Sequence, residues 1–491
     1  MAMFGRRGAD KRTARVWLGG VSMAALVAAM AAAFPQPATA ESIRDALSAA
    51  YQTNPKLDAE RAKLRATDEE VSRAESGFRP TVDGAANLGH QKTTSKPASS
   101  TSGESDPWGY SISVRQSVFN GFRSTNDVAE ANAAVKAGRE DLRRVESTVL
   151  MEAVTAYMDV LRDTEIVRIR DNNVAVLSRD LEAAQTRRSV KEVTKTDVAQ
   201  AQARRARAVS AADLARANLK TSRAGYERVM GHAPASVSMP TLKIQGLPAT
   251  IDQAWEMAER QNPNVNSAMF REEAARHAVE KVRGELMPEV NVEASYAYRG
   301  NPSSAFDEQE AASISGRVSV PLYDGGEIRA RVRQAKHTQV SRIQEIEQAR
   351  TEVRASVTAA WSRLMAARAQ LKSDKVQVEA NRMALEGVRE EEKVGQRTLL
   401  DVLNAEQEYL SAQIDLVSTR HELVVASYQV LAQIGTMNAE SLEFGSDVYI
   451  PEAHYEEARG NWFGIAITHA DGHREAYQAN DPEEDGALIV E

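Results

Sequence analysis

Hydrophobic and polar residues alternate in four short segments of the chain, residues 82–88, 108–118, 290–298 and 312–320. In each segment the even-numbered positions carry mainly apolar or aromatic side chains, and the odd-numbered positions carry small or polar ones. A period of two is that of a β-strand with one apolar face and one polar face. The pattern therefore predicts four strands.

The four strands are expected to form two hairpins, because each pair flanks a polar stretch rich in Ser, Gly or Pro, residues 92–107 or 300–310. Their length suits tilted transmembrane strands, which have about ten residues. Four aromatic residues lie near the loop ends, where an interfacial girdle would place them: Trp108, Tyr110, Tyr296 and Tyr298. A soluble half-buried sheet would explain one such strand, but four of them favour membrane strands.

Most of the remaining chain is charged, Ala-rich and Gln-rich sequence that favours helix. Helical stretches are predicted over residues 123–188 and 327–393, and at about 1.5 Å per residue each would be close to 100 Å long if continuous. Returning helices should then run to Met230 and Ile434. Shorter helices are expected to precede the hairpins, from Pro55 and from Pro263.

Helices of this length indicate a coiled coil. The second returning helix carries apolar residues at heptad spacing: Leu403, Leu410, Val417, Val424 and Leu431. Its first-half counterpart carries alanines that allow close helix approach, among them Ala199, Ala203, Ala206 and Ala208. The polar helix faces fit either plain solvation or the lining of a water-filled tube, and periodicity leaves both interpretations open.

The chain contains an internal repeat. Asn54-Pro55 recurs as Asn262-Pro263 at an offset of 208, and Met230-Gly231 recurs as Ile434-Gly435 at an offset of 204. We therefore divide the chain into repeat 1 (41–231), a linker (232–250), repeat 2 (251–435) and a C-terminal extension (436–491). A duplication this regular indicates units that cannot bury their apolar faces alone.

Four strands cannot close a barrel, and an open sheet edge is not tolerated in lipid. The chain is therefore expected to oligomerise. Three copies would supply twelve strands, which lies within the even-numbered range of outer-membrane barrels. The predicted fold is thus a trimeric membrane β-barrel, with four strands from each chain, joined to a long α-helical coiled-coil barrel.

The N-terminus predicts export. Residues 1–40 combine a basic start, an apolar run and a small-x-small cleavage site at Ala38-Thr39-Ala40, which together indicate a cleaved signal peptide. The net charge of the whole chain is −8, and removal of this +4 segment leaves −12, which argues against nucleic-acid binding. The absence of cysteine fits a chain that folds outside the cytosol without disulfides.

Little in the sequence suggests catalysis. The chain has no cysteine nucleophile, no His-Glu-x-x-His spacing and no Gly-rich phosphate loop. His469 and His473 are four residues apart, which is a weak metal signal by itself. We therefore expect a protein that is not an enzyme and has no cofactor and no metal site.

Over residues 41–440 the chain resembles the TolC family of outer-membrane efflux and secretion channels. The motifs that carry this resemblance are the repeated Asn-Pro, the Gly turns after the hairpins and the stretch 394–405, Val-Gly-Gln-Arg-Thr-Leu-Leu-Asp-Val-Leu-Asn-Ala. The resemblance implies a homotrimer in outer-membrane lipid, with a twelve-helix periplasmic tunnel. It also implies a periplasmic adaptor and an inner-membrane transporter, ABC or proton-driven, as partners.

The resemblance also implies a gate at the far end of the tunnel. Arg397 looks like the arginine that links neighbouring helices, with Thr196 and Asp197 as its acceptor, and Asp401 looks like the constricting aspartate. The family's best-known member has a second aspartate where this chain has Asn404, and a tyrosine where it has Glu392. On the residues alone, Arg397 and Asp401 could equally form an i,i+4 surface pair.

Two classes of function stay open at this point. One is an export duct, predicted to serve type I protein secretion because residues 397–407 resemble that branch, with multidrug or small-molecule efflux as the alternative. The other is a structural periplasmic coiled coil without a pore. Within the extension, residues 471–491 are acidic and indicate a mobile tail, whereas 449–464 could pack on the tunnel or contact a partner.

Overall fold

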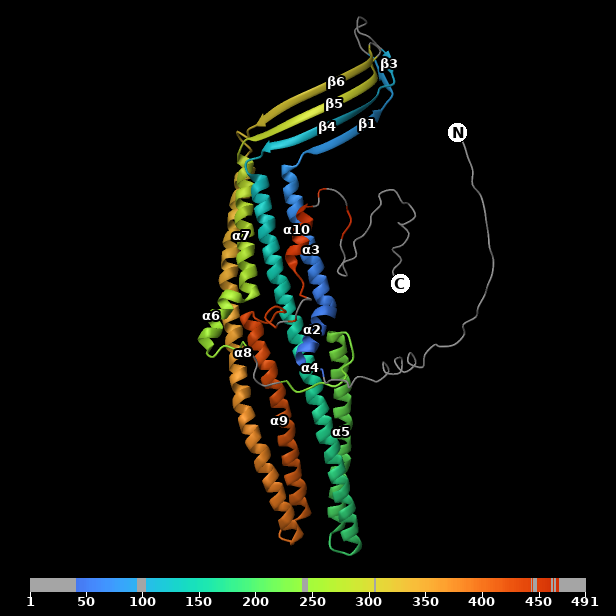
Figure 1. Cartoon of the computed structure of the whole chain (residues 1–491), viewed down its shortest axis with the longest axis vertical. Helices are drawn as coiled ribbons and strands as arrows, with labels where there is room; N and C mark the ends of the chain where they lie inside the picture. The colour runs from blue at the N-terminus through green and yellow to red at the C-terminus, as the bar shows by residue number, and fades with distance from the viewer. Residues whose placement is uncertain are drawn as a thin grey trace, which may run out of the picture.

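Long helices extend from one end of a four-stranded antiparallel sheet in the computed structural model of this chain (Figure 1). The structure describes residues 41–94, 103–240, 246–303, 306–442, 444, 448–460, 462 and 465–467. The predicted signal peptide, the acidic tail 471–491 and the pair His469 and His473 therefore lie outside the described residues.

The two halves repeat the same order of elements, except that the first half also contains the short strands β2 and β3. The first half contains α2 (Ile43–Thr53), α3 (Pro55–Glu75), η1 (Ser76–Phe78), β1 (Thr81–Leu88), β2 (Gln91–Thr93), β3 (Gly103–Ser105), β4 (Trp108–Phe119), α4 (Arg123–Ser189) and α5 (Lys195–Met230). The second contains α6 (Ile251–Gln261), α7 (Pro263–Arg283), η2 (Gly284–Leu286), β5 (Glu289–Ser303), β6 (Phe306–Ser319), α8 (Glu327–Lys393) and α9 (Leu399–Ile434), and α10 (Pro451–Gly460) follows. The predicted long, short and returning helices are all present.

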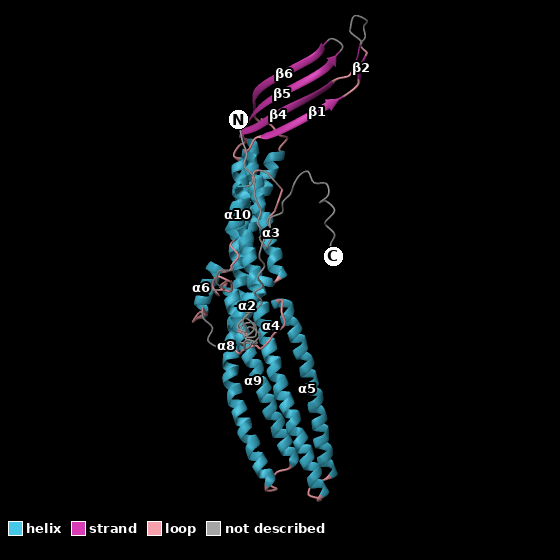
Figure 2. Ribbon diagram, turned by 45° about the vertical axis from the view of Figure 1, so that its right-hand side comes forward, coloured by secondary structure: helices cyan, strands magenta, loops and turns pink. Residues whose placement is uncertain are grey.

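The sheet has the order β1-β4-β5-β6, with every neighbouring pair antiparallel (Figure 2). Both predicted hairpins form, and they share one register: Val82 pairs with Val114 in the first, and Val290 with Val318 in the second. These are the same positions under the offsets of 208 and 204. The β4–β5 pairing joins the two halves, and β1 and β6 are the sheet edges.

The second hairpin is longer than its alternation predicts. Strand β5 continues to Ser303 and β6 begins at Phe306, so most of the predicted 300–310 loop is paired strand. Backbone pairing needs no apolar face, and the loss of alternation coincides with a register shift between Gly300 and Ser303. The predicted 92–107 loop likewise contains the short β2–β3 ribbon.

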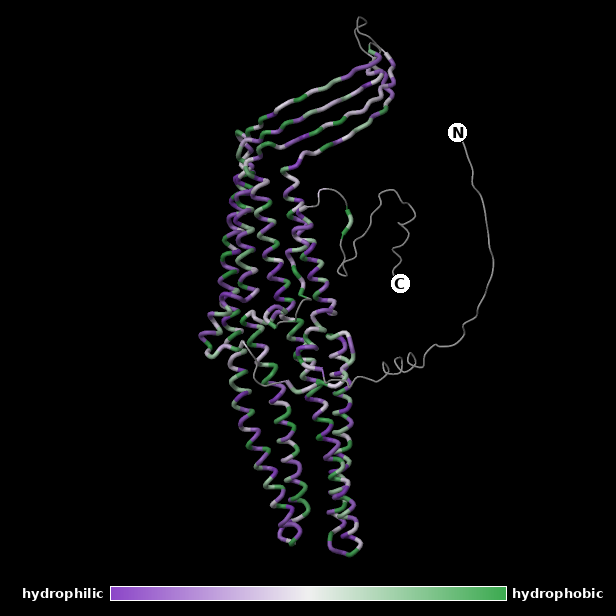
Figure 3. Tube along the Cα trace, in the orientation of Figure 1, coloured by the Kyte–Doolittle hydropathy of each residue, from purple (hydrophilic) through white to green (hydrophobic). Residues whose placement is uncertain are grey.

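The helices pack side by side in a fixed order. Nearer the sheet, α3, α4, α7 and α8 pack in that order, and farther away α4 and α8 pack against the returning helices α5 and α9. Hydrophobic and hydrophilic residues intermix along their whole length (Figure 3). In the described part of the chain, no helix is sufficiently long and apolar to cross a membrane.

The heptad prediction for α9 is confirmed, because four of its five positions are buried and Val417 is half-buried. The alanine prediction for α5 is only partly right. Ala208 is buried, but Ala199, Ala203 and Ala206 are exposed, and the close helix approach instead uses Ala201, Ala212 and Ala215.

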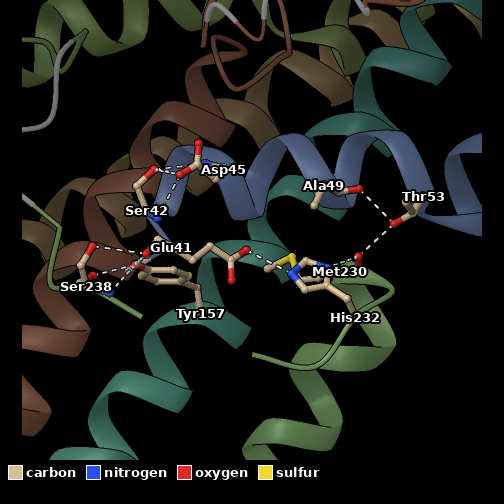
Figure 4. Close-up of polar contacts among 9 residues, drawn as sticks. All are labelled: Glu41, Ser42, Asp45, Ala49, Thr53, Tyr157, Met230, His232 and Ser238. Atoms are coloured by element: carbon tan, nitrogen blue, oxygen red, sulfur yellow. Dashed lines mark hydrogen bonds and ion pairs between the residues drawn. The ribbon is translucent and has the colours of Figure 1, made fainter. Parts of the chain in front are cut away.

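The two repeated dipeptides meet at one junction in each half. Asn262 ends α6, caps α7 and donates from Nδ2 to the Gln433 carbonyl oxygen near the end of α9, at 2.7 Å. In the first half Asn54 reaches the Val229 carbonyl oxygen at 3.3 Å. Beside it the Thr53 hydroxyl donates to the Met230 carbonyl oxygen at 3.0 Å (Figure 4). The short helices are thereby fixed to the ends of the returning helices, next to the main apolar core.

Helix α10 of the C-terminal extension packs on the long helices, as one of the two interpretations of residues 449–464 expects. Helix α10 lies along α3 (Figure 1), where the Tyr455 hydroxyl donates to Asn132 at 2.6 Å and Arg459 pairs with Glu75 at 2.7 Å. Glu75 is near the end of α3, so the extension runs toward the sheet.

Candidate functional site

The turn between α8 and α9 positions the predicted gate residues. Gly395 adopts a left-handed conformation with φ 78°, and Thr398 then caps α9. The Thr398 hydroxyl accepts from the Asp401 backbone N–H at 3.2 Å, and the Thr398 backbone N–H donates to Asp401 Oδ2 at 3.0 Å. The Thr398 backbone N–H and the Thr398 hydroxyl both donate to Asp401 Oδ2, and these two hydrogen bonds, followed by the charge of Arg397, lower the pKa of Asp401. Asp401 is therefore a carboxylate held in a fixed position at the tip.

The turn between α4 and α5 has the same construction. Thr194 caps α5, its backbone N–H donates to Asp197 Oδ2 at 2.8 Å, and Lys191 takes the left-handed conformation with φ 67°. Thr196 is exposed beside this cap. Thr-x-x-Asp before a helix is a capping-box signal, so these caps could have been found from the sequence.

Arg397 does not reach the predicted acceptor within one chain. Its Nε donates to Glu391 Oε2 at 2.9 Å, and this pair is the first cause of the raised pKa of Arg397. Asp197 is engaged by its own cap. A contact between Arg397 and Thr196 or Asp197 would therefore have to join neighbouring protomers.

The two positions that depart from the family's best-known member both pair with arginines of the first half. Asn404 Oδ1 accepts from Arg204 Nη2 at 2.7 Å, which joins α9 to α5. Glu392 is paired with Arg187, which joins α8 to α4. Sequence reasoning missed both arginines, because a partner some 200 positions away leaves no local pattern. Together they link the two helical hairpins of one chain near the tips.

Relatives of known type match the chain along nearly its whole mature length. The family model described as outer membrane efflux protein matches residues 46–232 and 254–436, one match in each half. The chain is 37% identical over 431 residues to the outer membrane efflux protein BepC of Brucella suis biovar 1 (strain 1330), covering 88% of this chain and 93% of that protein. It is 22% identical over 427 residues to the outer membrane protein TolC of Escherichia coli (strain K12), covering 83% and 85%.

A secretion protein and several solved channels are also similar. The alkaline protease secretion protein AprF of Pseudomonas aeruginosa is 23% identical over 350 residues, covering 69% of this chain and 72% of that protein. The structure of the outer-membrane channel OprN superposes with a TM-score of 0.71 at 20% identity, covering 80% and 89%. The structure of the Campylobacter jejuni CmeC outer membrane channel superposes with a TM-score of 0.73 at 14% sequence identity, and the match covers 85% of this chain and 89% of that channel.

These similarities agree with the geometry. Channels of this family are transport proteins without enzymatic activity, and they work as trimers with an adaptor and an inner-membrane transporter. The four-stranded sheet and the repeated helix pairs supply one protomer's share of such a channel. The chain therefore belongs to the outer membrane efflux protein family, the TolC family that its repeat resembles, and is an outer-membrane channel continued by a periplasmic tunnel.

Proposed function

We propose that this channel is the exit duct of a tripartite system that expels small molecules. The observation that carries this proposal is the 37% identity to a protein named for efflux, over 93% of that protein's length. Identity this extensive includes the tunnel and its tips, which are the parts that substrate and adaptor would meet.

Type I protein secretion, the branch that residues 397–407 resemble, is the second candidate. It is favoured by that stretch and by the similarity to AprF, a protein named for alkaline protease secretion. The two candidates differ in the inner-membrane partner, which would be a drug pump in one case and a protein-exporting ABC transporter in the other.

Deletion of the chromosomal copy in the native bacterium separates the candidates. Loss of small-molecule efflux predicts increased intracellular dye and lower inhibitory drug concentrations, with an unchanged set of secreted proteins. Loss of protein secretion predicts missing proteins in the culture medium with unchanged dye retention. Unchanged dye retention together with an unchanged secretome would contradict both candidates.

We further propose that Arg397, Asp401, Thr196, Asp197 and Asn404 form the closing network at the tunnel tip. Three Asp401 carboxylates would converge there in the trimer, repelling one another and attracting cations. Adaptor docking at the helix turns would move the hairpins apart and break the Arg397 contacts. Because exposed ion pairs are individually weak, the network must act collectively.

Neutralising Asp401 tests this network. In planar bilayers we expect Asp401→Asn to lower the cation-to-anion permeability ratio severalfold, and Arg397→Ala to raise the conductance severalfold. Asp213→Asn is the control, because Asp213 is an exposed acid on α5 that lies outside the proposed network. Equal selectivity in Asp401→Asn and wild type would remove Asp401 from the constriction.

The repeat also predicts how neighbouring protomers close the barrel. Within one chain Val114 of β4 pairs with Ala294 of β5. In the repeat, Val114 corresponds to Val318 on edge strand β6, 204 positions later. Ala294 corresponds to Ala86 on edge strand β1, 208 positions earlier. We therefore expect Val318 of one protomer to face Ala86 of the partner subunit.

Paired cysteines test this register, and the chain contains no cysteine that would interfere. The double variant Ala86→Cys and Val318→Cys should oxidise to covalent trimers on a non-reducing gel, because directly opposed strand residues lie within disulfide reach. Ala86→Cys with Arg317→Cys should stay monomeric on that gel, because a shift of one residue points the thiols to opposite faces. The reverse result would overturn the register.

A further inference from the structure

The two helical hairpins of one chain contact each other through α4 and α9. In this contact Leu177 of α4 and Leu403 of α9 share one small buried cluster, and the acidic residues Asp180 and Glu406 each follow three positions later on the same helices. The charge of Glu406 acts on the Asp180 carboxyl. The Glu406 side chain is only 6% exposed. Two acidic groups thus meet where opposite charges would be the ordinary choice.

One oxygen of each carboxyl has no partner among the described residues. Asp180 Oδ2 and Glu406 Oε2 are both buried without a hydrogen bond, whereas Glu406 Oε1 accepts from Arg389 of α8. An ionised carboxylate can only accept, so two ionised groups would leave both oxygens unsatisfied and would repel each other. A single proton between the two carboxyls supplies the missing donor and removes one of the charges.

We propose that Asp180 and Glu406 form a proton-binding site, in which one shared proton ties α9 to α4 and so holds the two hairpins of a protomer together. Loss of that proton replaces the hydrogen bond with repulsion between two carboxylates and loosens the contact. The site is separate from Arg397 and Asp401. It rests on the channel having a tunnel that opens and closes, and does not depend on what the channel exports.

Several arginines surround the two carboxyls, but in the described part of the chain only Arg389 forms an ion pair with one of them. Arg389 is already bound to Glu406, and Arg179 is the other cation that acts on Asp180. Three more arginines line the cleft beside Glu406: Arg170 on α4, and Arg204 and Arg207 on α5. Of these, Arg204 is bound to Asn404, and Arg205 on the same helix is bound to Ser178. No cation beyond Arg389 makes a described ion pair with either carboxyl.

The direction of the pH effect follows from burial. Burial first, and then the charge of Glu406, raise the pKa of Asp180 to about 6. Between its ordinary value of 3.8 and about 6, the closed pair keeps a proton that a separated carboxyl would lose. The contact is therefore most stable at the acidic end of this window, weakens as the pH rises through it, and changes little above it.

Single-channel recording of the purified trimer tests the site. Between about pH 5 and about pH 7.5 we expect the ratio of open to closed dwell times of the wild type to rise about tenfold or more, because one pKa unit is a factor of ten. Asp180→Asn should abolish this rise, because its amide donates permanently to Glu406 Oε2. Asp213→Asn, which alters an exposed acid on α5, should keep it.

Infrared spectroscopy of the same trimers detects directly whether the carboxyl pair holds a proton. Subtracting the spectrum of Asp180→Asn from that of the wild type should leave a carboxylic-acid band at about pH 5 that is lost by about pH 7.5, because the bands of other buried carboxyls, such as Glu146, cancel. A pH-dependent dwell-time ratio that survives in Asp180→Asn, or a difference spectrum without this band, would overturn the proposal. A trimer that never conducts would count against the export function instead, and the band would still decide the shared proton.

Discussion

Gly435→Ala is expected to destabilise the folded trimer by roughly 2–5 kcal/mol, the sum of a left-handed backbone penalty and an overpacking penalty. Gly435 follows α9 with φ 85°, a conformation that side chains with a Cβ rarely adopt. An added Cβ would also press against the Gln261 carbonyl and lie 2.9 Å from Asn262 Cα. Both contacts are backbone, so neither can rotate away. The apparent melting temperature, followed by circular dichroism in detergent, measures the loss.

Gly395→Ala is the matched control for this change. Gly395 has almost the same conformation, φ 78°, but nothing lies near the position of its Cβ. It should therefore show only the backbone penalty of roughly 1–2 kcal/mol. Equal melting temperatures for the two variants would show that the Gln261 contact contributes nothing.

Asn262→Ala should cost roughly 2–4 kcal/mol, because this side chain satisfies two separate backbone groups. Its Oδ1 accepts from the Asn264 backbone N–H at 2.9 Å, and its Nδ2 donates to the Gln433 carbonyl oxygen at 2.7 Å. Asn262 is only 2% exposed, so water cannot replace either hydrogen bond. The same melting experiment measures the effect.

Two further variants separate the contributions. Asn262→Asp keeps the helix cap but removes the donor to Gln433 and buries a charge, so it should also be strongly destabilised. Asn266→Ala, on the same helix, removes only a long 3.5 Å contact to Glu140 and should stay within about 0.5 kcal/mol of wild type. A stable Asn262→Asp would show that the bond to Gln433 is dispensable.

The fold was largely predictable because its signals are local. The period of two in β1, β4, β5 and β6 needs only neighbouring residues, and so does the heptad of α9. The internal repeat then showed that both halves have the same arrangement of elements. The structure explains why the two dipeptides recur: the Asn-Pro of each half is hydrogen-bonded to the last turn of that half's returning helix. The shared strand register follows from the same offsets.

Where local signals fade, the predictions were less accurate. Residues 300–310 lose their alternation, yet backbone pairing continues through most of them. Helix α10 is short, and its position is set by contacts with α3 that are nearly 400 positions away in sequence. The alanines that α5 buries depend on how that helix is rotated against α4, which composition does not specify.

The sequence by itself determined the strands, the long helices, the repeat and the family, and it contains the Thr-x-x-Asp signals of the caps that hold Asp197 and Asp401. Only the tertiary structure decided which side chains meet between the two helical hairpins: Arg204 and Asn404, Arg187 and Glu392, and Asp180 and Glu406. The reason is physical. Caps and periodicity depend on residues a few positions apart, whereas these pairs join residues about 200 positions apart, on helices whose stagger and rotation are fixed by packing along their whole length.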